Sequence, residues 1–183
     1  MNAERSLRAD AARNRAQVME AAETLIAERG FGVPVSEIAK KVGVGVGTVY
    51  RHFPTKEALF EAILTRKMHE LSAGLREFAE RDDPAAAFGD SLAYVIERAG
   101  RDRSLYEGLA AAADVDLGPG SELGAEMFDA EGRLLERAQE VGVVRRDFGP
   151  VEFKSFVAGC IVMAERGVAP ARVVELALKA LAP

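Results

Sequence analysis

A dense set of hydrogen-bond donors lies in the segment GVGTVYRHFPTK, residues 45 to 56. The donors are Thr48, Tyr50, Arg51, His52 and Lys56, and no carboxylate lies among them. Donors without acidic neighbours favour contact with anions, above all with the phosphates of a nucleic acid. Gly45 and Gly47 carry no side chain, which lets the backbone approach a partner closely. The spacing therefore predicts a surface that binds a polyanion through hydrogen bonds.

The surrounding pattern predicts the helices that would position these donors. Apolar residues recur with helical spacing between about Ala11 and Arg29, and Gly30 follows as a cap. A short helix follows Pro34, and Gly43 supplies the sharp turn after it. A second short helix then covers residues 46–52, because Pro54 prevents its continuation. A helix-turn-helix of this kind presents its second helix to the major groove of DNA.

After that turn, Thr55 is the expected N-cap of a long helix that reaches to about Glu80. Arg5, Arg8, Arg13 and Arg15 precede or open the first helix. From an N-terminal arm they would reach the DNA backbone or the minor groove.

This region resembles the DNA-binding domain of the TetR (tetracycline repressor) family of bacterial transcription regulators. The matching pieces are VMEAAETLIAERG at 18–30, Phe31, SEIAKKVGV at 36–44, GTVYRHF at 47–53 and the pair Lys56-Glu57. They cover about the first third of the chain. Two positions depart from the common pattern: Gly45 replaces a Ser or Thr, and Pro34 replaces a Thr. Both changes remove a hydroxyl, which Ser36 and the backbone N–H groups near Gly45 would replace.

The predicted DNA-contacting residues are Ser36, Gly45, Val46, Gly47, Thr48, Tyr50, Arg51, His52 and Lys56. Lys56 lies in the first turn of the long helix, within reach of a backbone phosphate. Tyr50 and His52 occupy positions that contact phosphates in the family. Thr48 and Val46 lie at the start of the second helix, the end that meets base edges. Two alternatives stay open, namely that Tyr50 packs against the first helix and that Arg51 faces solvent.

The charge of the chain is divided unevenly. Residues 1–56 hold nine Lys or Arg and six Asp or Glu, a formal charge of +3, whereas the remainder holds 15 and 23, a formal charge of −8. This asymmetry favours DNA binding by the N-terminal part, and chance scatter of surface charge is the alternative.

Composition narrows the class of protein. The chain has 183 residues, 49% of them apolar, and the abundance of good helix formers predicts an all-α fold. We expect no membrane span, no secretory signal and a cytoplasmic location. No catalytic set, cofactor motif or metal cluster stands out, and the two histidines stand apart from other ligand types. These features argue against an enzyme.

The sequence predicts about nine helices in two domains, a DNA-binding domain at 1–56 and a ligand-binding and dimerisation domain at 57–183. Beyond the long helix, we expect helices at 85–99, 103–113, 121–141, 151–165 and 170–181.

Apolar stripes mark the last two helices, which in the TetR family pair with their copies to form a dimer. The predicted interface residues are Phe153, Phe156, Val157, Cys160, Ile161, Val174, Leu178 and Leu181. The alternative is that both stripes pack within one chain. Cys160 is either a redox sensor or an inert small apolar residue.

The family also places an effector pocket among the middle helices. The residues that this resemblance implies are Phe78, Phe88, Tyr94, Tyr106, Leu109, Met127, Phe128 and Leu134. Each of them is alternatively part of a filled core, since aromatic residues at helical spacing are common there.

Together, these features predict a ligand-responsive transcription regulator. We expect a homodimeric repressor that binds a palindromic double-stranded operator and is released by an unknown small molecule. One rival is an activator or non-specific DNA binder with the same head. Another is a helical small-molecule-binding protein or enzyme whose head has lost DNA binding, and the intact GTVYRHF segment with Lys56 argues against it.

Overall fold

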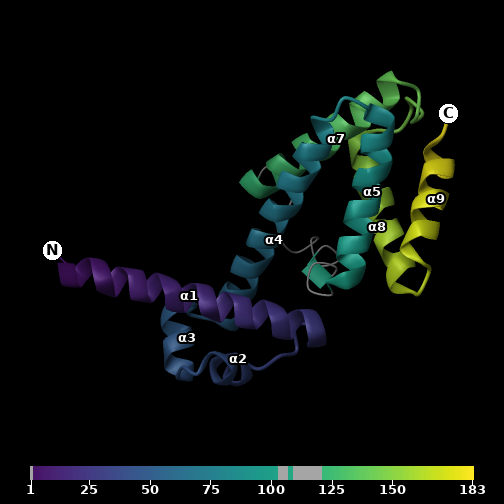
Figure 1. The fold of residues 1–183 in the computed structure, drawn as a ribbon. Helices are drawn as coiled ribbons and strands as arrows, with labels where there is room; N and C mark the ends of the chain where they lie inside the picture. Colours follow the sequence, from purple (N-terminus) through teal and green to yellow (C-terminus); the bar gives the residue numbers. More distant parts are fainter. Residues whose placement is uncertain (1, 103–106, 109–120) are drawn as a thin grey trace. The chain divides into compact units, whose positions relative to one another are not determined.

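The computed structural model describes residues 2–102, 107, 108 and 121–183, and the side chains within these ranges except those of residues 2–9, 122 and 123. The described part is all-α, as predicted, and contains eight helices (Figure 1). They are α1 (Asn2–Arg29), α2 (Val35–Val42), α3 (Val46–His52), α4 (Lys56–Ala79), α5 (Pro84–Arg101), α7 (Glu122–Glu140), α8 (Pro150–Glu165) and α9 (Pro170–Leu181). The helix expected at 103–113 lies almost wholly outside the described residues. The chain forms two compact units, residues 1–65 and 66–183.

The first unit is a small helical head built from α1, α2, α3 and the start of α4. Its core residues are Val18, Met19, Ala21, Ala22, Leu25, Ile26, Val33, Val35, Ile38, Ala39, Val49, Phe53, Leu59 and Ile63. The apolar stripe predicted on the first helix forms the buried side of α1. The helix itself begins at Asn2, well before the expected Ala11. The first residues are rich in Ala, Glu, Arg and Leu, which favour a helix without any apolar periodicity. Arg5 and Arg8 therefore lie on the same helix as Arg13 and Arg15, and not on an extended arm.

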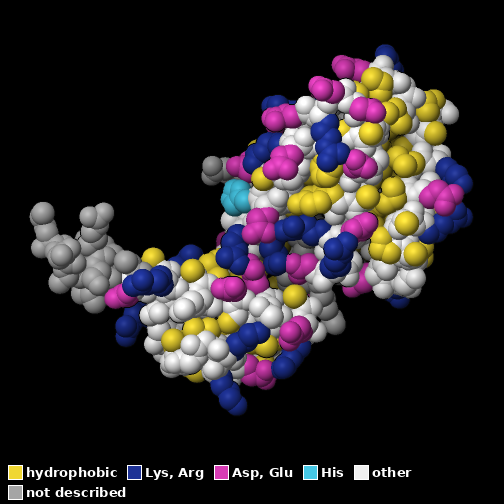
Figure 2. Space-filling model, viewed as in Figure 1, with side chains coloured by type: hydrophobic (Ala, Val, Ile, Leu, Met, Phe, Trp, Pro, Cys, Tyr) yellow, Lys and Arg dark blue, Asp and Glu magenta, His cyan; other side chains and the backbone are white. Residues whose placement is uncertain are grey.

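The second unit has α5 at its centre, in contact with α7, α8 and α9. Phe88 of α5 is fully buried and packs against Phe153 of α8, with ring centroids 5.5 Å apart. Figure 2 shows apolar side chains between charged ones over the α5 and α9 region of this unit. Among the described residues, no helix is both long and apolar enough to cross a membrane.

Local capping sets the ends of several helices. Thr55 accepts a hydrogen bond from the backbone N–H of Ala58, which confirms it as the N-cap of α4. Asp83 caps α5 by accepting from the N–H groups of Ala85 and Ala86. The guanidinium of Arg137 donates to the carbonyls of Ala79 and Arg81, so α7 satisfies the C-terminal end of α4.

Glu131 of α7 gives the second unit a predicted pH dependence. Burial raises the pKa of its carboxyl from 4.5 to about 7, against the opposing effect of the Lys154 ammonium. Below pH 4.5 the group is protonated in both the folded and unfolded states. Between pH 4.5 and about 7 the unfolded state releases this proton before the folded state does, so stability falls across that range by up to about 3 kcal/mol and levels off above pH 7. Glu131 keeps some solvent exposure, which makes this figure an upper limit.

We therefore expect Glu131→Gln to remove most of this loss. The urea midpoint of the variant should exceed that of the wild type at pH 8, and the gap should narrow at pH 5. The exposed Glu136 of the same helix supplies the control, Glu136→Gln. Equal pH dependence in the wild type and Glu131→Gln would contradict the assignment.

Candidate nucleic-acid interface

A glycine turn joins α2 to α3. Gly43 adopts φ = 77°, a left-handed conformation that other residues rarely take, and ends α2 there. Its N–H donates to the carbonyl of Lys40, and the N–H of Val44 donates to that of Ala39, at 3.2 and 3.0 Å. This closed turn fixes where α3 begins, with Gly45 as its extended N-cap residue.

The helix α3 has one buried side and one open side. Val49 is 1% exposed and anchors the helix in the head core, with Phe53 buried just beyond its end. On the opposite side, Val46 is 39% exposed and Tyr50 is 43% exposed. Gly47 and Arg51 are also exposed, and the spacing of these four residues places them on one face. The outward side chains therefore combine an apolar contact, a phenol and a guanidinium.

The remaining predicted residues border this face. Thr48 and His52 are partly exposed, and Ser36 is exposed in the first turn of α2. A Cβ built on Gly45 or Gly47 would meet no atom within 4 Å. The backbone at both glycines is consequently open to an approaching partner.

Two cations lie over aromatic rings next to α3. The guanidinium carbon of Arg15 is 4.9 Å from the centroid of the Phe53 ring, and the ammonium of Lys56 is 5.1 Å from that of Phe60. Ring contact restricts both side chains while leaving their charge available to an anion. The sequence suggested that Arg15 reaches DNA from an N-terminal arm and did not predict its contact with Phe53.

The one acidic residue of α2, Glu37, is already paired. Glu37 accepts from Arg29 at 2.7 Å, and α3 itself carries no carboxylate. The outward face of α3 therefore presents donors and apolar groups without an opposing negative charge of its own.

The residues predicted for an effector pocket have different surroundings. Tyr94 lines a pocket of 420 Å³ together with Glu97, Arg98, Arg101 and Asp102. Phe88, Met127 and Leu134 are buried in the packed interior of the second unit. Phe78 packs against Tyr94, and Phe128 lies beneath the Lys154 ammonium. Tyr106 and Leu109 lie outside the described residues, and the pocket assignment as a whole stays a prediction.

The sequence analysis did not predict that charged residues line this pocket. Tyr94, Arg98 and Asp102 follow a spacing of four, which places them along one side of α5. That spacing was the available signal, although charged residues four apart usually mark a solvated face.

The residues predicted for a dimer interface are largely covered by their own chain. Phe153, Val157, Cys160, Ile161 and Leu181 are buried, whereas Phe156, Val174 and Leu178 are partly exposed. Burial also raises the pKa of the Cys160 thiol, which favours the unreactive form. A different side of α8 is open, with Val151, Ser155, Ala158, Gly159 and Val162 all exposed.

A helix-turn-helix head followed by a helical second unit is the architecture of helix-turn-helix DNA-binding regulators, and this chain has it. Residues 18–63 match the family described as bacterial regulatory proteins of the tetR family. Residues 83–183, more than half of the chain, match the C-terminal domain described as transcriptional regulator SbtR-like.

Individual proteins show the same relationship. The crystal structure of a TetR transcription regulatory protein from Mycobacterium vanbaalenii is 34% identical, with 97% of this chain and 99% of that chain covered and a TM-score of 0.65. An HTH-type transcriptional regulator of Staphylococcus aureus is 39% identical over 71 residues, and only 37% of each chain is covered. This chain therefore spans about a third of the length of that curated relative. RolR, solved with the ligand resorcinol, shares the fold at 22% identity and a TM-score of 0.61, with 94% of this chain and 89% of RolR covered.

The chain belongs to the TetR family of bacterial transcription regulators, a family of DNA-binding proteins and not of enzymes.

Proposed function

We propose that this chain acts in the cytoplasm as a homodimeric repressor that binds a palindromic operator and is released by a small-molecule effector. The observation that carries the proposal is the outward face of α3, which presents donors and no carboxylate. Residues 1–56 form the DNA-binding domain in this proposal, and residues 57–183 form the effector-binding and dimerisation domain.

The proposed contacts follow the geometry of the head. Val46 and Thr48, near the start of α3, contact base edges, and Tyr50 and Arg51 extend the contact to phosphates. The phosphate contacts are completed by Ser36, His52, Lys56 and the backbone at Gly45 and Gly47.

The exposed side of α8 supports the dimer. Small residues at Ser155, Ala158 and Gly159 lie between Val151 and Val162, which are 67% and 39% exposed. Exposed apolar side chains around small residues suit close packing of one helix against another copy. Leu176 of α9 adds an exposed side chain of the same kind.

The pocket at Tyr94 supports an effector. Its volume lies within the range of small-molecule sites, about 300–1,000 Å³. RolR, which shares the fold, binds resorcinol in its solved structure. In this proposal the effector acts on α4, the helix that begins at Lys56 beside the DNA-binding residues.

The experiment that tests repression at a specific operator compares two duplexes of equal length. One carries a palindrome taken from the DNA that flanks the gene, and the other carries the same bases in scrambled order. We expect a preference of at least about a thousandfold at physiological salt. Equal affinity for both would favour a non-specific DNA binder and would refute operator recognition.

Thr48→Ala should weaken discrimination between correct and substituted bases. The loss of one good base contact corresponds to about 1–3 kcal/mol. The measurement is the affinity of wild type and variant for a set of singly substituted operators. A variant with an unaltered base preference at every position would remove Thr48 from direct readout.

Gly47→Ala separates DNA binding from folding. The added methyl group meets no atom of the head, and alanine is favoured over glycine in a helix by about 1 kcal/mol. We therefore expect unchanged or higher thermal stability together with weaker operator binding, because the methyl group occupies space next to the DNA. Full affinity in Gly47→Ala would exclude close backbone approach at this position.

A further inference from the structure

We propose that the pocket beside α5 binds a small organic carboxylate through the guanidinium of Arg98, in place of Glu70 of α4. The inference rests on the proposed function and deepens it by assigning a chemical class to the effector. It follows from how the charged groups around the pocket are paired.

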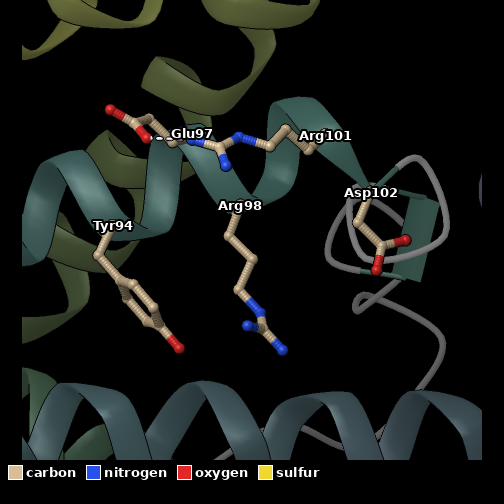
Figure 3. A pocket seen from close by; sticks show the side chains of 5 residues that line it. All are labelled: Tyr94, Glu97, Arg98, Arg101 and Asp102. Carbon is tan, nitrogen blue, oxygen red and sulfur yellow. Dashed lines mark hydrogen bonds and ion pairs between the residues drawn. The ribbon is translucent and has the colours of Figure 1, made fainter.

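Figure 3 shows the side chains that line the pocket. Tyr94, Arg98 and Asp102 extend from one side of α5, whereas Glu97 and Arg101 lie against each other on the other side of the helix. The Glu97–Arg101 pair has its closest atoms 2.5 Å apart. The side of the pocket that faces away from this pair is therefore defined by a phenol, a guanidinium and a carboxylate.

The carboxylate of Asp102 is already neutralised. It pairs with the ammonium of Lys67 from α4, and the two side chains are only 18% and 10% exposed. Separating a largely buried ion pair leaves a charge without a partner, which is costly. Asp102 is consequently a poor attachment point for a cationic ligand.

The pair between Arg98 and Glu70 is different. Its closest atoms are 2.6 Å apart, but the side chains are 32% and 50% exposed. Ion pairs in contact with solvent contribute little to stability, so the carboxylate of a ligand can replace Glu70 at small cost. Glu70 can then be hydrated, whereas Arg98 gains a partner with the two-pronged geometry that a guanidinium prefers.

Tyr94 supplies an aromatic wall next to Arg98. Its ring fits against Gly74 of α4, where an added Cβ would lie 2.6 Å from the phenol oxygen. The ring of Phe78 packs on the Tyr94 ring, with centroids 5.5 Å apart. The guanidinium carbon of Arg98 lies 5.8 Å from the centroid of the Tyr94 ring. A ring held in this way favours a flat or aromatic carboxylate over a flexible chain.

The exchange of partners at Arg98 also gives the ligand a means of acting on α4. Glu70 links α4 to α5 through Arg98, and Lys67 links the same two helices through Asp102. A carboxylate that displaces Glu70 removes the first link and leaves the second intact. It thereby changes how α4 is held.

The test uses the full-length protein and three probes with the same ring, namely benzoate, benzamide and benzylamine. Calorimetry or NMR titration should show that benzoate binds at least about tenfold more tightly than the neutral and cationic probes. Arg98→Gln should weaken benzoate binding about tenfold or more. The benzoate affinity of Arg98→Lys should lie between those of the wild type and Arg98→Gln. Glu70→Gln should instead tighten it, because the competing carboxylate is gone.

Arg133→Gln is the matched control, since Arg133 is an exposed arginine paired with Asp129 on α7. It should leave benzoate binding unchanged. A preference for benzylamine, no saturable binding of benzoate, or equal benzoate affinity in the wild type, Arg98→Gln and Glu70→Gln would overturn the inference.

Binding of duplex DNA, measured on the same preparations without a probe, separates this inference from the proposed function. Absence of DNA binding by the wild-type protein refutes the proposed function. DNA binding without benzoate binding refutes only the carboxylate site.

Discussion

Gly159→Arg is expected to convert the proposed dimer into a folded monomer and to weaken operator binding by at least about a hundredfold. Gly159 lies on the open side of α8, and a Cβ there would meet no atom within 4 Å. Arginine also favours a helix over glycine, so the single chain has no reason to unfold. In a dimer packed on this side, the same arginine places a long charged chain between two closely packed helices. The loss in affinity follows because a monomer engages only one half-site, without the gain of about 10²–10⁴ from bivalent attachment.

The measurement is light scattering on the purified variant, followed by titration of operator DNA. Gly132→Arg provides the same chemical change on α7, where a Cβ also meets no neighbouring atom. It should remain dimeric and bind DNA normally. If Gly159→Arg stayed dimeric, the proposed interface on α8 would be wrong.

Lys56→Ala is expected to weaken binding to all DNA sequences by about tenfold or more, because a charge-assisted phosphate contact disappears. The side chain is partly buried and its ammonium lies over the Phe60 ring, so it is restricted before DNA arrives. The plot of log affinity against log salt concentration should lose a slope of about one.

Lys40→Ala is the control for Lys56→Ala, since Lys40 is an exposed lysine of α2 outside the proposed contact set. Its salt slope should match that of the wild type. An unchanged slope in Lys56→Ala would show that this lysine does not contact a phosphate.

The head was largely predictable because its signals are local. The glycine at 43 sets a left-handed turn, Thr55 caps the helix that follows it, and Val49 and Phe53 carry the buried side. Each of these depends on residues only a few positions apart. The start of α1 could not be predicted from such local signals, because apolar residues do not recur at helical spacing in its polar first turns.

The second unit was harder because its surfaces depend on contacts between distant residues. Apolar residues occur on two sides of α8, and the sequence does not reveal that Phe153 packs against Phe88 while Val162 stays exposed. The pocket likewise depends on how Tyr94 fits against Gly74, a position twenty residues earlier. Periodicity identifies an apolar face, but only the packing shows whether the chain itself covers that face.

The most direct test of DNA recognition by α3 is a hydroxyl-radical footprint on the DNA that flanks the gene. Two recognition helices in a symmetric dimer should protect two patches whose centres are one helical turn apart, about 34–36 Å. Substitution of Thr48 and Lys56 together should erase both patches. A backbone that is cleaved evenly along its whole length, even at low salt and saturating protein, would contradict the account.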